Sequence, residues 1–181
     1  MRKKSFEIAL SGISTAIAVL FLSLGILSGY LTALGYLIGI LALMLPLSKQ
    51  FYLGGFLAYA ATCILTLILG AVARFWDLVP FIIFFGLHPI LNSLQLKFNV
   101  NKWLALAIKW VWFVGTLFVG YFLIFGGLLG GSLLPEQVYD FINKYIYILI
   151  PVLGAPFIFV YDYLIFRCQM LVNGLVLRIR K

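Results

Sequence analysis

The sequence predicts an all-α polytopic membrane protein, a six-helix transmembrane bundle with both termini in the cytoplasm. Of the 181 residues, 65% are hydrophobic and only 10% are charged, and the charges gather at short breaks between long apolar runs. A run of about 20 apolar residues matches the hydrocarbon thickness of a bilayer. A helix also satisfies its own backbone polar groups inside lipid, which an open strand does not. Residues 1–181 are therefore expected to form a single transmembrane domain.

The first four spans end at polar or glycine-containing breaks. Ser28-Gly29 ends the first span and Ser48-Lys49-Gln50 ends the second. The polar break 74–77 closes the third span, and the segment 97–102 follows the fourth. The predicted spans are residues 8–27, 31–47, 51–72 and 78–94.

The last two spans surround the longest connection. The fifth covers 104–129 and ends in two glycine pairs, and the sixth covers 145–171 and is interrupted by Pro151, Gly154 and Pro156. Between them, residues 132–144 are less apolar. Apolar side chains recur there at helical spacing, so this segment is expected to form an amphipathic helix on the outer surface.

The distribution of Lys and Arg orients the chain, because short basic loops stay cytoplasmic. With the amino terminus inside, the inner side collects Arg2, Lys3, Lys4, Lys49, Lys97, Lys102, Arg167, Arg178, Arg180 and Lys181. The outer side keeps only Arg74 and Lys144 among the cations of the loops. The net charge of +8 is then explained by topology and by contact with anionic membrane lipid, and no nucleic-acid partner is expected.

The first apolar run is longer than the core of a typical signal peptide and no small-x-small cleavage site directly follows it, so it is expected to remain as a span. Cys63 and Cys168 fall within or near the membrane and are expected to be ordinary buried thiols.

Polar groups within the membrane are costly and often functional. His88 and Asn92 lie in the fourth span beside Pro89, whose missing N–H frees a carbonyl near Phe85. This kink favours a polar pocket. The alternative is that both side chains hydrogen-bond to a neighbouring helix and hold the bundle together.

Lys109 and Asp162 lie in the fifth and sixth spans, which are expected to be antiparallel neighbours. Their depths from the inner face overlap, so an ion pair is geometrically possible. The alternatives are that Lys109 extends to the cytoplasmic headgroups, or that the two residues serve a proton or ion relay.

A cluster of aromatic and charged residues is predicted on the outer side, in two loops. It comprises Arg74, Trp76, Asp77, Glu136, Tyr139 and Asp140. Such groups suit the binding of a small, flat, polar molecule. They also suit an interfacial aromatic belt that anchors the bundle at the headgroups.

No catalytic pattern is present, so the chain is not expected to be an enzyme. There is no Walker loop, no HExxH, no GxSxG and no pair of intramembrane carboxylates. With a single His no metal site is expected, and no cofactor is predicted.

The first span carries small residues four apart, which allow close helix approach in lipid. They are Gly12 with Ala16, Ser11 with Thr15, and Ser14 with Ala18. Together with the size of the chain, the six spans and the inside termini, this pattern resembles the substrate-binding S components of energy-coupling factor (ECF) vitamin transporters. The first helix of that family carries an AxxxA-type motif, which Gly12 and Ala16 would match here. The stretches 84–89 and 160–163 are also similar to those of uncharacterised small membrane proteins of Gram-positive bacteria.

The resemblance implies a subunit that binds a vitamin or another small nutrient at the bacterial cell membrane. It also implies an ECF coupling subunit, docked on Gly12 and Ala16, and ATPase subunits as partners. The alternative is a scaffold or assembly protein without transport activity, whose polar residues only fix helix packing. A small intramembrane enzyme is the third reading, and it lacks a visible nucleophile.

Overall fold

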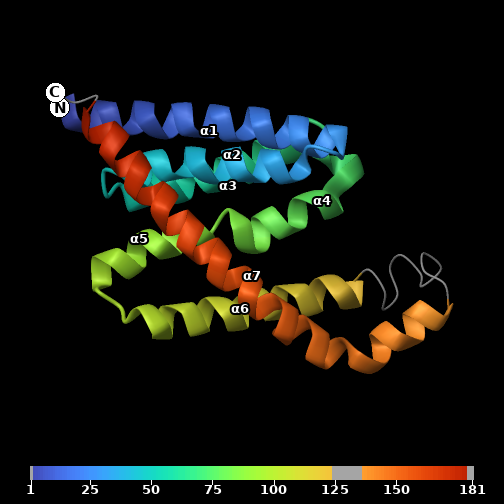
Figure 1. The fold of residues 1–181 in the computed structure, drawn as a ribbon. Helices are drawn as coiled ribbons and strands as arrows, with labels where there is room; N and C mark the ends of the chain where they lie inside the picture. Colours follow the sequence, from blue (N-terminus) through green and yellow to red (C-terminus); the bar gives the residue numbers. More distant parts are fainter. Residues whose placement is uncertain (1, 124–135, 179–181) are drawn as a thin grey trace. The chain divides into compact units, whose positions relative to one another are not determined.

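The computed structural model describes residues 2–123 and 136–178, and within these ranges all regular structure is helical (Figure 1). The helices are α1 (Arg2–Ser28), α2 (Thr32–Leu47), α3 (Tyr52–Ile68), η1 (Ala71–Arg74), α4 (Phe75–Pro80), η2 (Phe81–Phe85), α5 (His88–Phe98), α6 (Lys102–Leu123) and α7 (Glu136–Arg178). Among the described residues, four helical stretches are long and apolar enough to cross a membrane: Ser5–Ser28, Val72–Phe98, Lys102–Phe122 and Lys144–Val176. The protein is therefore a helical, membrane-embedded protein.

α2 and α3 are apolar but shorter, with 16 and 17 residues. At a rise of 1.5 Å per residue each is somewhat shorter than a hydrocarbon core of about 30 Å. The prediction of six complete spans thus stays a prediction, and so does the position of the termini.

The described chain falls into two compact units. Unit 1 comprises residues 1–99 and 165–181, and unit 2 comprises residues 100–164. The single transmembrane domain predicted over residues 1–181 stays a prediction.

α1 and α2 form the closest helix pair of unit 1, because glycine faces glycine where they cross. A Cβ atom on Gly35 would lie 2.7 Å from the carbonyl oxygen of Phe21 and 3.2 Å from the Cα atom of Gly25. Further along the pair, the hydroxyl of Ser14 donates a hydrogen bond of 2.6 Å to the carbonyl of Ala42. Small residues here permit backbone approach without side chains between the helices.

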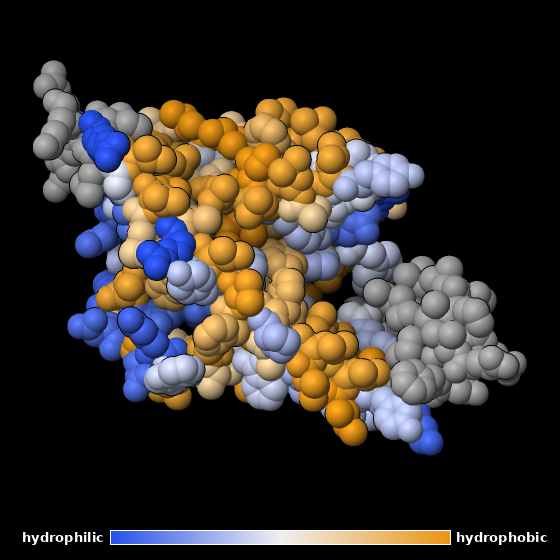
Figure 2. Space-filling view, viewed as in Figure 1, coloured by the Kyte–Doolittle hydropathy of each residue, from blue (hydrophilic) through white to orange (hydrophobic). Residues whose placement is uncertain are grey.

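The apolar core of unit 1 follows from this approach. Its fully buried large side chains include Leu22, Ile26, Ile40, Leu43 and Met44 on α1 and α2. By contrast, large apolar residues such as Leu20, Leu24 and Leu53 are more than half exposed. Figure 2 shows such residues as an extended orange surface on the visible face. Large exposed apolar patches are rare on soluble monomers and are expected where lipid covers the surface.

The stretch from α4 to α5 contains a π-helical turn, η2. The N–H of Gly86 donates to the carbonyl of Phe81, five residues earlier, at 2.8 Å. In an α-helix the N–H of Gly86 would donate to the carbonyl of Ile82. Here that carbonyl accepts a hydrogen bond from the hydroxyl of Tyr59 instead, at 2.6 Å. π-turns are uncommon and mark irregular points in a helix. Here the turn connects α3 to the α4–α5 stretch through a partly buried hydrogen bond.

Unit 2 consists of α6 and the part of α7 up to residue 164. Contrary to the sequence expectation, α7 continues through Pro151 and Pro156 as one helix of 43 residues. A proline inside a helix removes one N–H donor, yet such helices are tolerated in membranes when neighbouring groups compensate. The carbonyls that lose a donor are those of Tyr147 and Val152, four residues before each proline. The indole N–H of Trp110 makes a separate contact and donates to the carbonyl of Pro151 at 3.4 Å.

The amphipathic helix expected over 132–144 is also not a separate element. Residues 136–144 form the beginning of α7 and continue without a break into the apolar part of the helix. Residues 132–135 lie outside the described part of the chain. No glycine or proline occurs between Glu136 and Ile150, so nothing in the local sequence ends the helix there.

Candidate functional site

The outer cluster predicted from the sequence is centred on η1 and α4, in unit 1. Arg74 ends η1, and Trp76 and Asp77 lie in the first turn of α4. The nearest approach of the Arg74 guanidinium to the Asp77 carboxylate is 3.9 Å, and both side chains are nearly half exposed. Trp76 is 37% exposed and packs edge-on against Phe75, with 5.7 Å between the ring centroids. The three residues thus form one surface group.

Arg74 also caps the end of α1. Its Nη1 donates a hydrogen bond of 2.8 Å to the carbonyl of Ile26, which lies in the last turn of that helix. The last carbonyls of a helix lack partners within the helix and carry partial negative charge, so a guanidinium stabilises them. The chain leaves α1 through Gly29, at φ 73°, a conformation that glycine adopts without strain. The guanidinium covers the space that a side chain at Gly29 would need.

Tyr36 of α2 contacts the same surface group, and it was not among the residues predicted for the site. Its hydroxyl donates to the backbone carbonyl of Asp77. Its ring lies between Phe81 and Phe85, with centroid distances of 5.7 and 5.3 Å. A lone Tyr in an apolar helix gives little signal in a sequence, because tyrosine is common near membrane interfaces.

The second half of the predicted cluster stands at the beginning of α7 in unit 2. Glu136, Tyr139 and Asp140 are helical, but their side chains lie outside the described part of the structure. A site shared between these residues and Arg74, Trp76 and Asp77 stays a prediction.

His88 and Asn92 are fully buried in α5, one turn apart. Pro89 lies in the first turn of α5, where its missing N–H costs nothing. The His88 ring packs edge-on against Phe84, with 5.4 Å between the centroids. Neither the oxygen nor the nitrogen of the Asn92 amide has a hydrogen-bond partner among the described residues. The region around Pro89 therefore contains buried polar groups, and the polar pocket expected there stays a prediction.

In unit 2, Lys109 of α6 and Asp162 of α7 form an ion pair. The distance from Lys109 Nζ to Asp162 Oδ1 is 2.7 Å, and the side chains are 4% and 13% exposed. Of the arrangements that the sequence left open, the structure contains the pair and not a lysine extended to the headgroups. A charge inside a membrane is stabilised by such a direct opposite charge.

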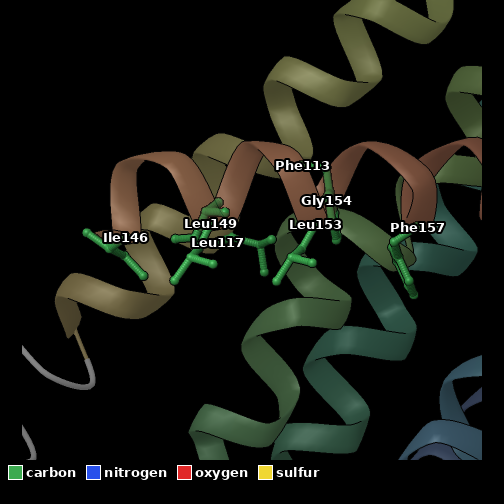
Figure 3. A pocket seen from close by; sticks show the side chains of 8 residues that line it. Phe113, Leu117, Ile146, Leu149, Leu153, Gly154 and Phe157 are labelled. Atoms are coloured by element: carbon green, nitrogen blue, oxygen red, sulfur yellow. The ribbon is translucent and has the colours of Figure 1, made fainter. Parts of the chain in front are cut away.

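An aromatic stack leads from this pair toward an apolar groove. Phe157 stacks on Phe113 and on Tyr161, with centroid distances of 5.2 and 5.9 Å. Beyond the phenylalanines, α6 and α7 line a groove of about 370 Å³ without a polar side chain (Figure 3). Its lining residues are Phe113, Leu117, Ile146, Leu149, Ile150, Leu153, Gly154 and Phe157. A groove of this kind can hold an acyl chain or another helix, and it offers no group that orients a polar ligand.

A polar pocket of about 170 Å³ lies at the opposite end of unit 1 from Arg74, where α2, α3, α5 and the last part of α7 end or begin. Gln169 and Asn173, which the sequence analysis did not select, contribute to it from α7. A signal was present, because two amides four residues apart lie on one face of an apolar helix.

The small residues of α1 divide into two faces. Ser14 and Ala18 are buried against the rest of unit 1, whereas Gly12 and Ala16 are exposed. A Cβ atom added at Gly12 would meet no atom within 4 Å. Ser11 and Thr15 donate their hydroxyls to carbonyls four residues earlier in the same helix.

Both cysteines are free thiols, and the described residues contain no group of three His, Cys, Asp or Glu side chains that could hold a metal ion. In comparisons with known proteins, no family model matches the chain, and neither a curated protein nor a solved structure matches it.

Proposed function

We propose that this protein is the substrate-binding membrane subunit of an uptake transporter for a vitamin or another micronutrient, similar to an ECF S component and energised by a separate ATPase module. In this proposal the chain crosses a bacterial cytoplasmic membrane six times, with both termini inside. It captures its ligand from the outer side and docks on a membrane coupling subunit through α1.

The observation that supports the proposal most is the open small-residue face of α1. Gly12 and Ala16 are exposed, and a Cβ atom added at Gly12 would meet no described atom within 4 Å, whereas Ser14 and Ala18 on the neighbouring face of the same helix are buried. In lipid, helices associate through close packing at small residues, so this face would let a partner helix approach closely.

The outer residues are suited to ligand capture in one respect. A guanidinium has five N–H donors, and Arg74 donates one of them to Ile26, so others are available to a carboxylate or phosphate. Trp76 offers a partly exposed ring next to it, on which a flat ligand could stack.

A coupling test compares equal changes at two open glycines. Gly12→Leu is expected to abolish copurification with an ATPase-containing complex, because the added side chain prevents close helix approach. Gly115→Leu in α6 is the matched control, since Gly115 also has no atom within 4 Å of an added Cβ. Ala16→Leu should reproduce the effect of Gly12→Leu. Normal complexes with both α1 variants would remove the main support for the transporter proposal.

The topology is tested separately by single-cysteine labelling in a background without Cys63 and Cys168. Lys49→Cys, between α2 and α3, is expected to resist a membrane-impermeant reagent in intact cells, because basic loops stay inside. Labelling from outside would refute the topology.

Ligand capture is tested best at Trp76, because loss of the Arg74 cap would also loosen α1. With a panel of vitamins and detergent-purified protein, Trp76→Ala is expected to lower affinity without lowering thermal stability. Tyr30→Ala is the control, since Tyr30 is the most exposed aromatic residue of the neighbouring outer connection, at 99%. Equal loss of stability in both variants, with binding unchanged, would indicate an anchoring role instead.

A scaffold protein without transport activity is the second candidate, and one observation favours it. Arg74, Tyr36 and the backbone of Asp77 connect the ends of α1, α2 and α4 through hydrogen bonds. These polar groups therefore have an architectural role that needs no ligand. A chain that copurifies with membrane proteins other than an ATPase module, and with no small molecule, would support this candidate.

A further inference from the structure

The polar pocket of unit 1 combines features that a small amphiphilic ligand requires. Its walls come from the end of α2, the beginning of α3, the last turns of α5 and the last part of α7. Among the described residues of the lining, Lys97 is the only one with a charged side chain, and none is a carboxylate. The pocket is therefore electropositive and suits an anion.

The cation is held at the wall by an aromatic ring. Lys97 Nζ lies 4.6 Å from the centroid of the Tyr52 ring, a favourable cation–π distance. Tyr52 is also the first residue of α3, whose N-cap residue Phe51 supplies no side-chain cap. The first N–H groups of a helix have no partners within it and favour a negative group nearby.

One acceptor in the lining lacks a donor, and a second can accept one. Gln169 is 2% exposed, its Nε2 donates to Asn173 Oδ1 at 3.1 Å, and its Oε1 has no hydrogen-bond partner among the described residues. The hydroxyl of Ser48 donates to the carbonyl of Leu45, so its oxygen can accept a further bond. The phosphate group of a diester can pair with Lys97, but it carries no proton for either acceptor, so the donors must come from other groups of the ligand.

The remaining wall is apolar and continues onto the exposed surface. Leu47 and Leu96 line the pocket, and Leu96 and its neighbour Phe98 are 55% and 66% exposed. A ligand with an acyl chain can place its polar group in the pocket and its chain along these residues.

We propose that this pocket binds the headgroup of an anionic phospholipid that carries free hydroxyls, such as the glycerophosphate group of phosphatidylglycerol. The phosphate lies against Lys97, and the glycerol hydroxyls donate to Gln169 Oε1 and Ser48 Oγ. Basic pockets between membrane helices bind lipid headgroups through the same combination of charge and hydrogen bonds.

Native mass spectrometry of the detergent-purified full chain tests this with three lipids that have the same acyl chains. Phosphatidylglycerol carries charge and hydroxyls, phosphatidylmethanol carries the same charge without hydroxyls, and phosphatidylcholine has no net charge. We expect phosphatidylglycerol to bind about tenfold more tightly than either of the others. Equal binding of phosphatidylglycerol and phosphatidylmethanol would overturn the hydroxyl recognition.

Matched variants locate the binding. Lys97→Gln is expected to remove most of the preference for phosphatidylglycerol over phosphatidylcholine. Lys102→Gln removes the same charge from another exposed helix end that does not line the pocket, and it should leave the preference intact. Gln169→Met is expected to remove the preference over phosphatidylmethanol alone. Equal effects of the two lysine variants would show that surface charge, and not the pocket, attracts the lipid.

One further measurement separates a lipid from a soluble phosphate ester. Glycerol 3-phosphate in excess should fail to displace phosphatidylglycerol, because it lacks the acyl chains that contact Leu96. Complete displacement would identify a free glycerophosphate as the occupant and overturn the lipid assignment. Because Lys97 is exposed, its replacement is not expected to affect folding, so the test holds even if Gln169→Met does not fold.

Discussion

Breaking the Lys109–Asp162 ion pair from one side should destabilise the protein strongly. The pair has a 2.7 Å contact and both side chains are mostly buried. Lys109→Met leaves the Asp162 carboxylate in a low-dielectric environment without its cation, which costs about 3–5 kcal/mol. Asp162→Leu leaves the ammonium in the same position and should cost a similar amount.

The double variant Lys109→Met/Asp162→Leu should recover most of that loss. Replacing both members of a buried pair by apolar groups of similar volume is often neutral or stabilising, since both desolvation penalties disappear. A double-mutant cycle should therefore give a coupling energy of about 3 kcal/mol or more, at the upper end for residues in contact.

The measurement is equilibrium unfolding in mixed micelles, followed by tryptophan fluorescence. Three of the four tryptophans, at positions 103, 110 and 112, lie on α6 with Lys109 and report on this helix. Lys102→Met is the control, because it removes the same charge from an exposed position of α6. Additive effects of the two single replacements, or single effects no larger than that of the control, would refute the coupling.

Four other changes test the packing of unit 1 by the same unfolding assay. Gly35→Ala should lower the free energy of unfolding by about 1–3 kcal/mol, because the added methyl group would press on a backbone carbonyl of α1. Gly12→Ala, in open space, should leave it unchanged or raise it by up to about 1 kcal/mol. Equal effects at the two glycines would contradict the difference in packing. Arg74→Met should cost about 1 kcal/mol by removing the bond to Ile26, a modest value since the side chain is nearly half exposed, and an unchanged midpoint would show that the cap is unimportant. Asn92→Leu should stabilise by about 1–3 kcal/mol, because it replaces a buried amide that has no hydrogen-bond partner in the described part of the chain by an apolar group of similar shape. A loss of stability would show that Asn92 is hydrogen-bonded in the folded protein.

The helical segments of unit 1 could be predicted from the sequence because their ends are encoded locally. Gly29 and Asn99 have positive φ and follow the last residues of α1 and α5, and the predicted breaks fall there. Glycine and asparagine tolerate this conformation better than other residues. Local signals of this kind depend on one or two residues and need no knowledge of the tertiary contacts.

The features missed by the sequence analysis depend on partners distant in the chain. The proline positions predicted an interruption of α7, but the helix continues through both prolines; a proline weakens a helix without always ending it, and the surroundings in the fold decide the outcome. The π-turn likewise becomes favourable through Tyr59, which lies in another helix. The role of Arg74 as a cap requires that the end of α1 be close to η1, and no residue spacing shows this.

The hydrogen bonds that Arg74 and Tyr36 make at the helix ends of unit 1 suggest how a ligand bound there would affect α1. Arg74, Tyr36 and Asp77 connect three helix ends, so a ligand that drew Arg74 away from Ile26 would also loosen the end of α1. The same helix carries the open face of Gly12 and Ala16 nearer its beginning. Ligand binding at the outer end and docking at that face would then be coupled through one helix, and the coupling would be reciprocal. The proposed transporter therefore requires that partner binding change ligand affinity, whereas a scaffold requires no such linkage.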